Sequence, residues 1–128
     1  MEYRDLQRES VTWAGKAFGW DHVNNRQLRA LRMIEEAVEV AQALHLPKEK
    51  VLLAVEHVYK RRPGQIAQEL GGLMVTIAVL AQAIVVDPMA AFEAEVRRVL
   101  SMPLEHFAKR NREKNALGLN VDEGSGLA

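Results

Sequence analysis

The chain has 128 residues, which fits one domain of about 100–150 residues, and its 48% apolar and 27% charged composition is typical of a soluble globular protein. It carries 17 Lys and Arg against 17 Asp and Glu, which argues against a nucleic-acid binder because such proteins usually have a basic excess. Since it has no cysteine, disulfides, thiolate metal sites and a cysteine nucleophile are excluded.

Turn signals and capping residues divide the chain into six predicted helices. Gly19 ends the first, Asn24 or Asn25 caps the second, and a proline stands at the start of three others. We therefore expect helices over about residues 5–18, 25–45, 47–60, 65–86, 88–100 and 103–118.

The β-branched run Val75, Thr76, Ile77 and Val79 is the segment that could instead be a buried strand. Its length without turn signals favours a helix, and the sequence offers no second strand of similar strength to pair with it. The sequence thus predicts an all-α fold, with one domain over residues 1–118 and a flexible C-terminal tail over residues 119–128.

Membrane association is not predicted. The first five residues contain no apolar segment of the kind found in signal peptides. The most apolar stretch, residues 70–86, contains Gln82 and is slightly short for a bilayer span, which needs about 20 residues. We expect a cytoplasmic protein with no membrane partner.

Three carboxylates share one side of the second predicted helix. At about 100° per residue, Glu35, Glu36 and Glu39 fall within an arc of about 100°, and Arg32 lies in the same arc. The rest of that helix is largely apolar, which is typical of a buried helix. Buried carboxylates repel one another unless a cation lies among them, so the cluster indicates a Mg²⁺ site. The alternative is a solvated acidic stripe paired with Arg29 and Arg32.

Glu69 stands on an apolar side of the fourth predicted helix. The side chains within about 60° of it are Ile66, Leu73, Thr76 and Leu80. An ionised glutamate buried there costs several kcal/mol unless it is paired. We expect either a metal shared with the second helix or a buried salt bridge to Arg32.

Two adjacent glycines, Gly71 and Gly72, interrupt the same helix. Each costs about 1 kcal/mol relative to alanine inside a helix. The pair therefore indicates close helix packing or the close approach of a ligand.

Two tryptophans, Trp13 and Trp20, flank the end of the first predicted helix. Both fit core or interface positions, and stacking on a nucleobase is the alternative because an indole offers a flat apolar face. The four histidines are dispersed and follow no metal-ligand spacing, so we assign them no role.

With these residues in view, the chain resembles the MazG-like all-α nucleoside triphosphate pyrophosphohydrolases. That superfamily also includes the dimeric all-α dUTPases and phosphoribosyl-ATP pyrophosphohydrolase. The family pattern is E-E-x-x-E on one helix, followed by E-x-x-D on a later helix. The first half is present as Glu35-Glu36-Ala37-Val38-Glu39, and Glu69-Leu70-Gly71-Gly72 resembles the second. The resemblance covers about residues 26–115.

Two positions depart from the family pattern. Gly72 stands where the family has its metal-binding Asp, and Gln68 stands where many members have Glu. The loss of one oxygen ligand puts turnover in question, although Mg²⁺ can replace a missing ligand by water.

The resemblance implies a MazG-like helical bundle that hydrolyses a nucleoside or deoxynucleoside triphosphate to the monophosphate and pyrophosphate. It implies Mg²⁺, or Mn²⁺ in its place, held by Glu36, Glu39 and Glu69. Glu35 would accept the proton of the attacking water.

The C-terminal basic segment resembles the part of the family that contacts phosphate. Lys109 and Arg112 stand three residues apart and so share a helix face. Arg112 offers a planar fork and Lys109 a compact charge, so we expect both to bind phosphate. An ordinary solvated helix is the alternative.

Two further functions stay open beside the enzyme. One is a catalytically degenerate MazG-like module that binds a nucleotide or a protein without turnover, as the replacement at Gly72 suggests. The other is a helical oligomerisation module with no ligand. In every case the excess of apolar helix surface predicts a homodimer or homotetramer.

Overall fold

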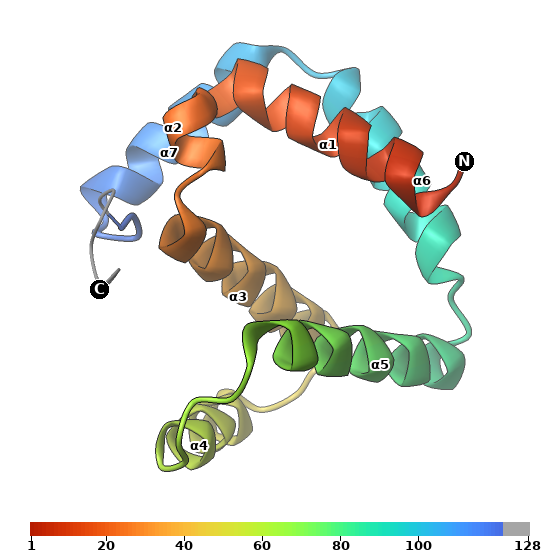
Figure 1. Ribbon diagram of the computed structural model, residues 1–128, viewed down its shortest axis with the longest axis vertical. Coiled ribbons are helices and arrows are strands. Elements are labelled where there is room, and N and C mark those ends of the chain that lie inside the picture. The colour runs from red at the N-terminus through yellow and green to blue at the C-terminus, as the bar shows by residue number, and fades with distance from the viewer. Residues whose placement is uncertain (122–128) are drawn as a thin grey trace. The chain divides into compact units, whose positions relative to one another are not determined.

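The computed structural model describes residues 1–121 and contains seven helices and no strand within them (Figure 1). They are α1 (Tyr3–Phe18), α2 (Trp20–Val23), α3 (Arg26–Ala43), α4 (Lys48–Tyr59), α5 (Ile66–Ile84), α6 (Pro88–Leu100) and α7 (Leu104–Ala116). The all-α prediction is confirmed, and the β-branched run at residues 75–79 lies inside α5. Most of the predicted tail, residues 122–128, lies outside the described part of the chain.

The six predicted helices are all present, and α2 is an addition. Gly19, with a φ of 89°, separates α2 from α1. Asn25 caps α3, since its Oδ1 accepts a hydrogen bond of 3.1 Å from the backbone N–H of Leu28. The prediction of Asn24 or Asn25 as the cap is thereby resolved in favour of Asn25.

Residues 1–34 together with residues 89–121 form one structural unit. Within it α1 packs against α2 and α7. Its buried apolar side chains are Leu6, Ala14, Ala17, Leu28, Val96 and Phe107. The rings of Tyr3 and Phe92 lie 5.9 Å apart and so join α1 to α6, which run side by side in Figure 1.

Residues at the end of the described chain form hydrogen bonds with the start of α3 within this unit. The side-chain amide of Asn25 donates a 2.7 Å hydrogen bond to the carbonyl of Val121, and Arg32 donates one of 2.7 Å to the carbonyl of Leu119. Arg32 also donates to the side chain of Asn120. Residues 119–121 are therefore held by side chains that belong to the first two turns of α3 and its cap.

Residues 35–88, all of them described, form the second unit. Its three helical segments, the end of α3, α4 and α5, do not pack closely against one another. Ala81 is the only buried residue in this range. Within this single chain the expected burial of α3 and α5 is therefore not observed, because no packing between the three segments covers their apolar faces.

Among the described residues, one helix is long and apolar enough to cross a membrane by length and composition alone. It is α5, with 19 residues and a mean hydropathy of 1.4. Core helices of soluble proteins meet the same criterion, so this finding does not by itself assign α5 to a bilayer.

Candidate functional site

The carboxylates of the E-E-x-x-E segment lie on a continuous α-helix, as predicted. Glu36 and Glu39 are exposed on α3, and Glu35 is half-buried. Glu39 forms no hydrogen bond or ion pair with any of the described residues 1–121. Its oxygens are therefore accessible to a cation from solvent.

The alternative for the acidic stripe was pairing with Arg29 and Arg32, and among the described residues Arg29 does not take part in it. The Nη1 atom of Arg29 lies 3.2 Å from Nδ1 of His22. Arg32 reaches the backbone at Leu119. Arg29 is thus paired with a histidine rather than with a glutamate, and pairing of the stripe with Arg32 stays a prediction.

Glu69 lies in the first turn of α5, where a negative charge is favoured by the partial positive charge of the helix N-terminus. Its carboxylate folds back over Gly64: a Cβ atom placed on Gly64 would lie 2.8 Å from Oε1 of Glu69. Glu69 is exposed, so the expected cost of burying its charge does not arise. It therefore needs neither a metal nor a salt bridge to be stable where it is.

Within residues 1–121, no three His, Asp or Glu side chains lie together as a ready metal site. Glu36 and Glu39, three residues apart on one helix, are a pair of oxygen donors that fits Mg²⁺, because this ion commonly takes one or two carboxylates and keeps several waters. Glu69 belongs to a different helix, α5. Its place as a third ligand stays a prediction.

The two basic residues of α7 differ in their partners. The Nη2 atom of Arg112 lies 2.6 Å from Oε1 of Glu105 in an exposed ion pair. Lys109 is exposed and has no ion pair with any described residue. An exposed ion pair contributes about 0–1 kcal/mol, so a phosphate could displace Glu105 from Arg112 at little cost.

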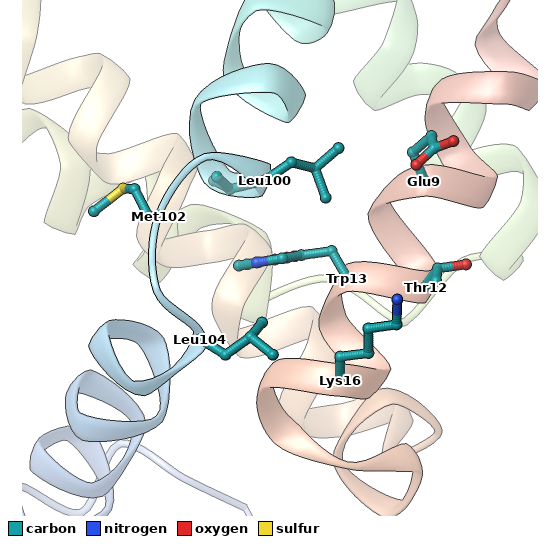
Figure 2. A pocket seen from close by; sticks show the side chains of 8 residues that line it. Glu9, Thr12, Trp13, Lys16, Leu100, Met102 and Leu104 are labelled. Atoms are coloured by element: carbon teal, nitrogen blue, oxygen red, sulfur yellow. The ribbon is translucent and has the colours of Figure 1, made fainter.

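Trp13 lines a cavity of about 240 Å³ within the first unit (Figure 2). The lining residues are Glu9, Thr12, Trp13 and Lys16 from α1, Val99 and Leu100 from the end of α6, and Met102 and Leu104 after it. The indole Nε1 of Trp13 is buried and has no hydrogen-bond partner among the described residues. Trp13 also packs edge-on against Phe18 and Phe107, with centroid distances of 5.5 and 4.8 Å, so its main role is in the core.

Trp20 occupies a different position. It is 54% exposed, and its indole covers the backbone of Gly15, where an added Cβ would lie 2.5 Å from Cζ2 of Trp20. Trp20 lines no part of the cavity beside Trp13.

Comparisons with protein-family models, with curated proteins and with solved structures give no match to this chain. The resemblance to the MazG-like enzymes therefore depends on the residues themselves.

The structure also reveals a polar cluster that the sequence did not predict. The Nε2 atom of His22 lies 3.0 Å from Oδ1 of Asn111, and Nδ1 receives the hydrogen bond from Arg29. Because a guanidinium can only donate, Nδ1 must accept, so the proton of the neutral ring is on Nε2. His22 and Asn111 are 89 residues apart in the chain, and no local pattern could have paired them.

Burial dominates the electrostatics of this cluster. It lowers the pKa of His22; the hydrogen bond with Asn111 opposes this shift, and the positive charges of Arg29 and Arg32 add to it. Burial, followed by the charge of Arg32, also lowers the pKa of Arg29. His22 is consequently neutral at pH 7 and acts as a hydrogen-bonding residue.

Proposed function

We propose that this chain is a MazG-like, Mg²⁺-dependent nucleoside triphosphate pyrophosphohydrolase. It would convert a nucleoside or deoxynucleoside triphosphate and water to the monophosphate and pyrophosphate. The observation that carries the proposal is the display of Glu35, Glu36 and Glu39 on one side of a continuous helix, with Glu39 unpaired among the described residues. No protein partner other than further copies of this chain is proposed.

Glu36 and Glu39 would hold Mg²⁺, with Glu69 as a further ligand and Mn²⁺ as a substitute ion. When bound, the metal would neutralise charge that develops on the phosphates of the substrate. Gly72, in place of the family's Asp, leaves one position to water, which Mg²⁺ tolerates because it dehydrates reluctantly.

The chain's own side chains would perform the remaining steps. Glu35, half-buried beside the ligand pair, would take a proton from the attacking water. The water oxygen would form a bond to the α-phosphorus, and the bond to the bridging oxygen would break, so that pyrophosphate leaves. Lys109 and Arg112 would contact the phosphates, with Arg112 exchanging Glu105 for a phosphate oxygen.

A nucleobase would find its apolar contact at Trp13 rather than Trp20, because Trp13 lines the cavity. At about 240 Å³ the cavity is a little smaller than ligand pockets of about 300 Å³ and above. It would therefore admit a base but not a whole nucleotide.

Release of pyrophosphate from a panel of canonical and modified nucleoside triphosphates, with and without Mg²⁺, tests the reaction. We expect Mg²⁺-dependent release from at least one substrate. If no substrate is cleaved but a non-hydrolysable triphosphate analogue still binds, the degenerate binding module replaces the enzyme. If neither occurs, the ligand-free oligomerisation module replaces both.

The substitution Glu39→Gln tests the metal site separately from the chemistry. It keeps size and helix propensity but removes the charge, so calorimetric titration should show weaker Mg²⁺ binding, and turnover should collapse while the helix content stays unchanged. Glu49→Gln, at an exposed position in the first turn of α4, is the matched control and should leave the Mg²⁺ isotherm unchanged. An unchanged isotherm in Glu39→Gln would remove Glu39 from the ligand set.

Glu35→Gln separates the proton acceptor from the ligands. If Glu35 takes the water proton, this variant should bind Mg²⁺ as the wild type does and lose about 100-fold or more in kcat. Loss of Mg²⁺ binding instead would make Glu35 a ligand.

A further inference from the structure

We propose that the cavity beside Trp13 binds guanine, and that Glu9 selects this base. The inference rests on the proposed function, because it names the base of the nucleotide that the chain would hydrolyse. It concerns the first unit alone, since every residue that lines the cavity lies within residues 1–34 or 89–121.

The cavity has a polar wall and an apolar wall. The polar wall consists of Glu9, Thr12 and Lys16, which fall within an arc of about 60° on α1 at about 100° per residue. The apolar wall comes from the end of α6 and the segment after it, with Leu100 and Leu104 as its labelled leucines in Figure 2. Such a cavity suits a flat molecule with apolar faces and a polar edge.

The volume of the cavity suits a two-ring base. It is about 240 Å³, whereas a cavity of about 150 Å³ in an apolar core already holds benzene. In Figure 2 the indole of Trp13 lies between Leu100 and Leu104, where it provides an aromatic surface for the ring of a base. The cavity therefore holds the base, and the sugar and phosphates stay outside it.

Two opposite charges stand at the ends of the polar wall. Glu9 is half-buried and Lys16 is exposed, and neither forms an ion pair with any residue of the described range 1–121. Their Cα atoms lie about 10 Å apart along the helix, at about 1.5 Å per residue. A half-buried carboxylate beside apolar side chains is costly without a partner. A ligand that brings hydrogen-bond donors to Glu9 and an acceptor to Lys16 would satisfy both groups.

Guanine offers these groups in the required order. Its Watson–Crick edge presents the 2-amino group, then N1–H, then the O6 acceptor. An ionised carboxylate can only accept, so the two oxygens of Glu9 match the two adjacent donors. Lys16 can only donate and would bond to O6, while the hydroxyl of Thr12, between them, can donate or accept. Guanine thereby provides a partner for each polar side chain of the wall.

The other common bases fit this wall less well. Adenine and cytosine each bring one amino group, and the ring nitrogen beside it would direct a lone pair at the second oxygen of Glu9. Uracil and thymine have one N–H between two carbonyl groups, which would repel the carboxylate. An apolar amino acid also carries both charges, but on groups attached to one carbon, whereas Glu9 and Lys16 are about two helical turns apart.

Calorimetric titration of the whole chain with nucleosides, without metal, tests this cavity. Nucleosides carry no phosphate, so neither Mg²⁺ nor the basic residues of α7 contribute. We expect guanosine to bind. Inosine lacks the 2-amino group and should bind about 10-fold more weakly, and adenosine and cytidine should bind more weakly still. The NMR signal of the indole N–H of Trp13 should shift on addition of guanosine, whereas that of Trp20, which lines no part of the cavity, should not.

Two variants separate the roles of the charged residues. Glu9→Gln has one acceptor oxygen in place of two, so the preference for guanosine over inosine should fall to less than about 3-fold. Lys16→Met loses the donor to O6, which both nucleosides carry, so both should bind about 10-fold more weakly with their ratio unchanged. Glu113→Gln, at an exposed position of α7 outside the cavity, is the control and should bind as the wild type does.

This inference and the proposed function can fail separately. If triphosphates are cleaved but guanosine does not bind, or binds no better than adenosine, the reaction stands and the guanine site is wrong. If guanosine binds as expected but no triphosphate is cleaved, the guanine site stands in a binding module without turnover. A guanosine preference that survives Glu9→Gln, or tighter binding of leucine than of guanosine, would overturn the proposal.

Discussion

Arg29 directs its guanidinium at an imidazole rather than at a carboxylate: its Nη1 lies 3.2 Å from Nδ1 of His22. This contact exists only while the ring is neutral, because a protonated Nδ1 carries a hydrogen and would repel the guanidinium. Arg29 and His22 thereby couple the start of α3 to α2 in a manner that depends on pH.

Stability should fall in mild acid because of His22. Its pKa in the folded chain is below 6.5, while in the unfolded chain it is about 6.5. As the pH falls below 6.5, the unfolded state binds a proton at His22 while the folded state does not. The free energy of unfolding therefore decreases until the pH falls below the pKa of His22 in the folded chain. The contribution of neutral His22 to the free energy of unfolding is fully present above about pH 7.5. Urea unfolding at pH 7.5 and 5.5 measures the loss.

His22→Gln should remove the contribution of His22 to the pH dependence of stability. The urea concentration at the unfolding midpoint should therefore change less between pH 7.5 and 5.5 in this variant than in the wild type. His57→Gln, on the exposed face of α4, is the control and should behave as the wild type. Equal pH dependence in His22→Gln and the wild type would show that other groups cause the effect.

Asn25 should contribute more stability than an ordinary helix cap, because its side chain makes two hydrogen bonds. Its oxygen caps α3 at Leu28, and its amide donates to Val121. Asn25→Ala should cost about 1–2 kcal/mol in the free energy of unfolding. Asn25→Asp keeps the cap but sets a carboxylate oxygen, which can only accept, against the carbonyl oxygen of Val121, so it should also destabilise the chain.

The neighbouring asparagine provides the comparison for this measurement. Asn24 is exposed, and its replacement by alanine should change the free energy of unfolding by less than about 0.5 kcal/mol. Equal costs at residues 24 and 25 would contradict the assignment of Asn25 as the cap.

Gly15→Ala should destabilise the chain although it lies within a helix. Helix propensity alone favours alanine by about 1 kcal/mol. The added methyl, however, would lie 2.5 Å from Cζ2 of Trp20, and overpacking of this kind costs about 1–3 kcal/mol. In a Trp20→Ala background the clash disappears, so the same glycine substitution should become stabilising. A double-mutant cycle from denaturant unfolding shows whether the sign reverses.

Val85→Gly should stabilise α5 at its end. Val85 adopts a left-handed conformation with φ of 56° and ψ of 49° and is 90% exposed. That conformation costs a β-branched residue about 1–2 kcal/mol, and almost no packing is lost with the side chain. We expect a gain of about 1 kcal/mol by thermal unfolding. Val86→Gly, one residue later, should give no gain.

The positions of the helices were predictable because their boundaries depend on local signals. Gly19, Asn25 and Pro88 each act on the residues beside them, and the predicted bounds agree with the observed helices within a few residues. α2 escaped prediction because a four-residue helix is too short to show a periodic pattern.

Burial could not be predicted in the same way. The apolar composition of α5 predicts a buried helix, whereas Ala81 is its one buried residue in the described chain. Glu69 was therefore expected in an apolar environment and is instead exposed against Gly64. The contact of His22 with Asn111 escaped prediction for a related reason, since it arises only when α2 and α7 meet.

The location of the aromatic residues has a consequence for spectroscopy. Trp13 and Trp20, the two tryptophans of the chain, belong to the first unit, so residues 35–88 contain none. Tryptophan fluorescence, excited selectively over that of Tyr59, therefore follows the first unit alone, whereas far-ultraviolet circular dichroism records the helices of both. The difference between the midpoints of the fluorescence and circular-dichroism transitions therefore measures how cooperatively the two units, which share α3, unfold.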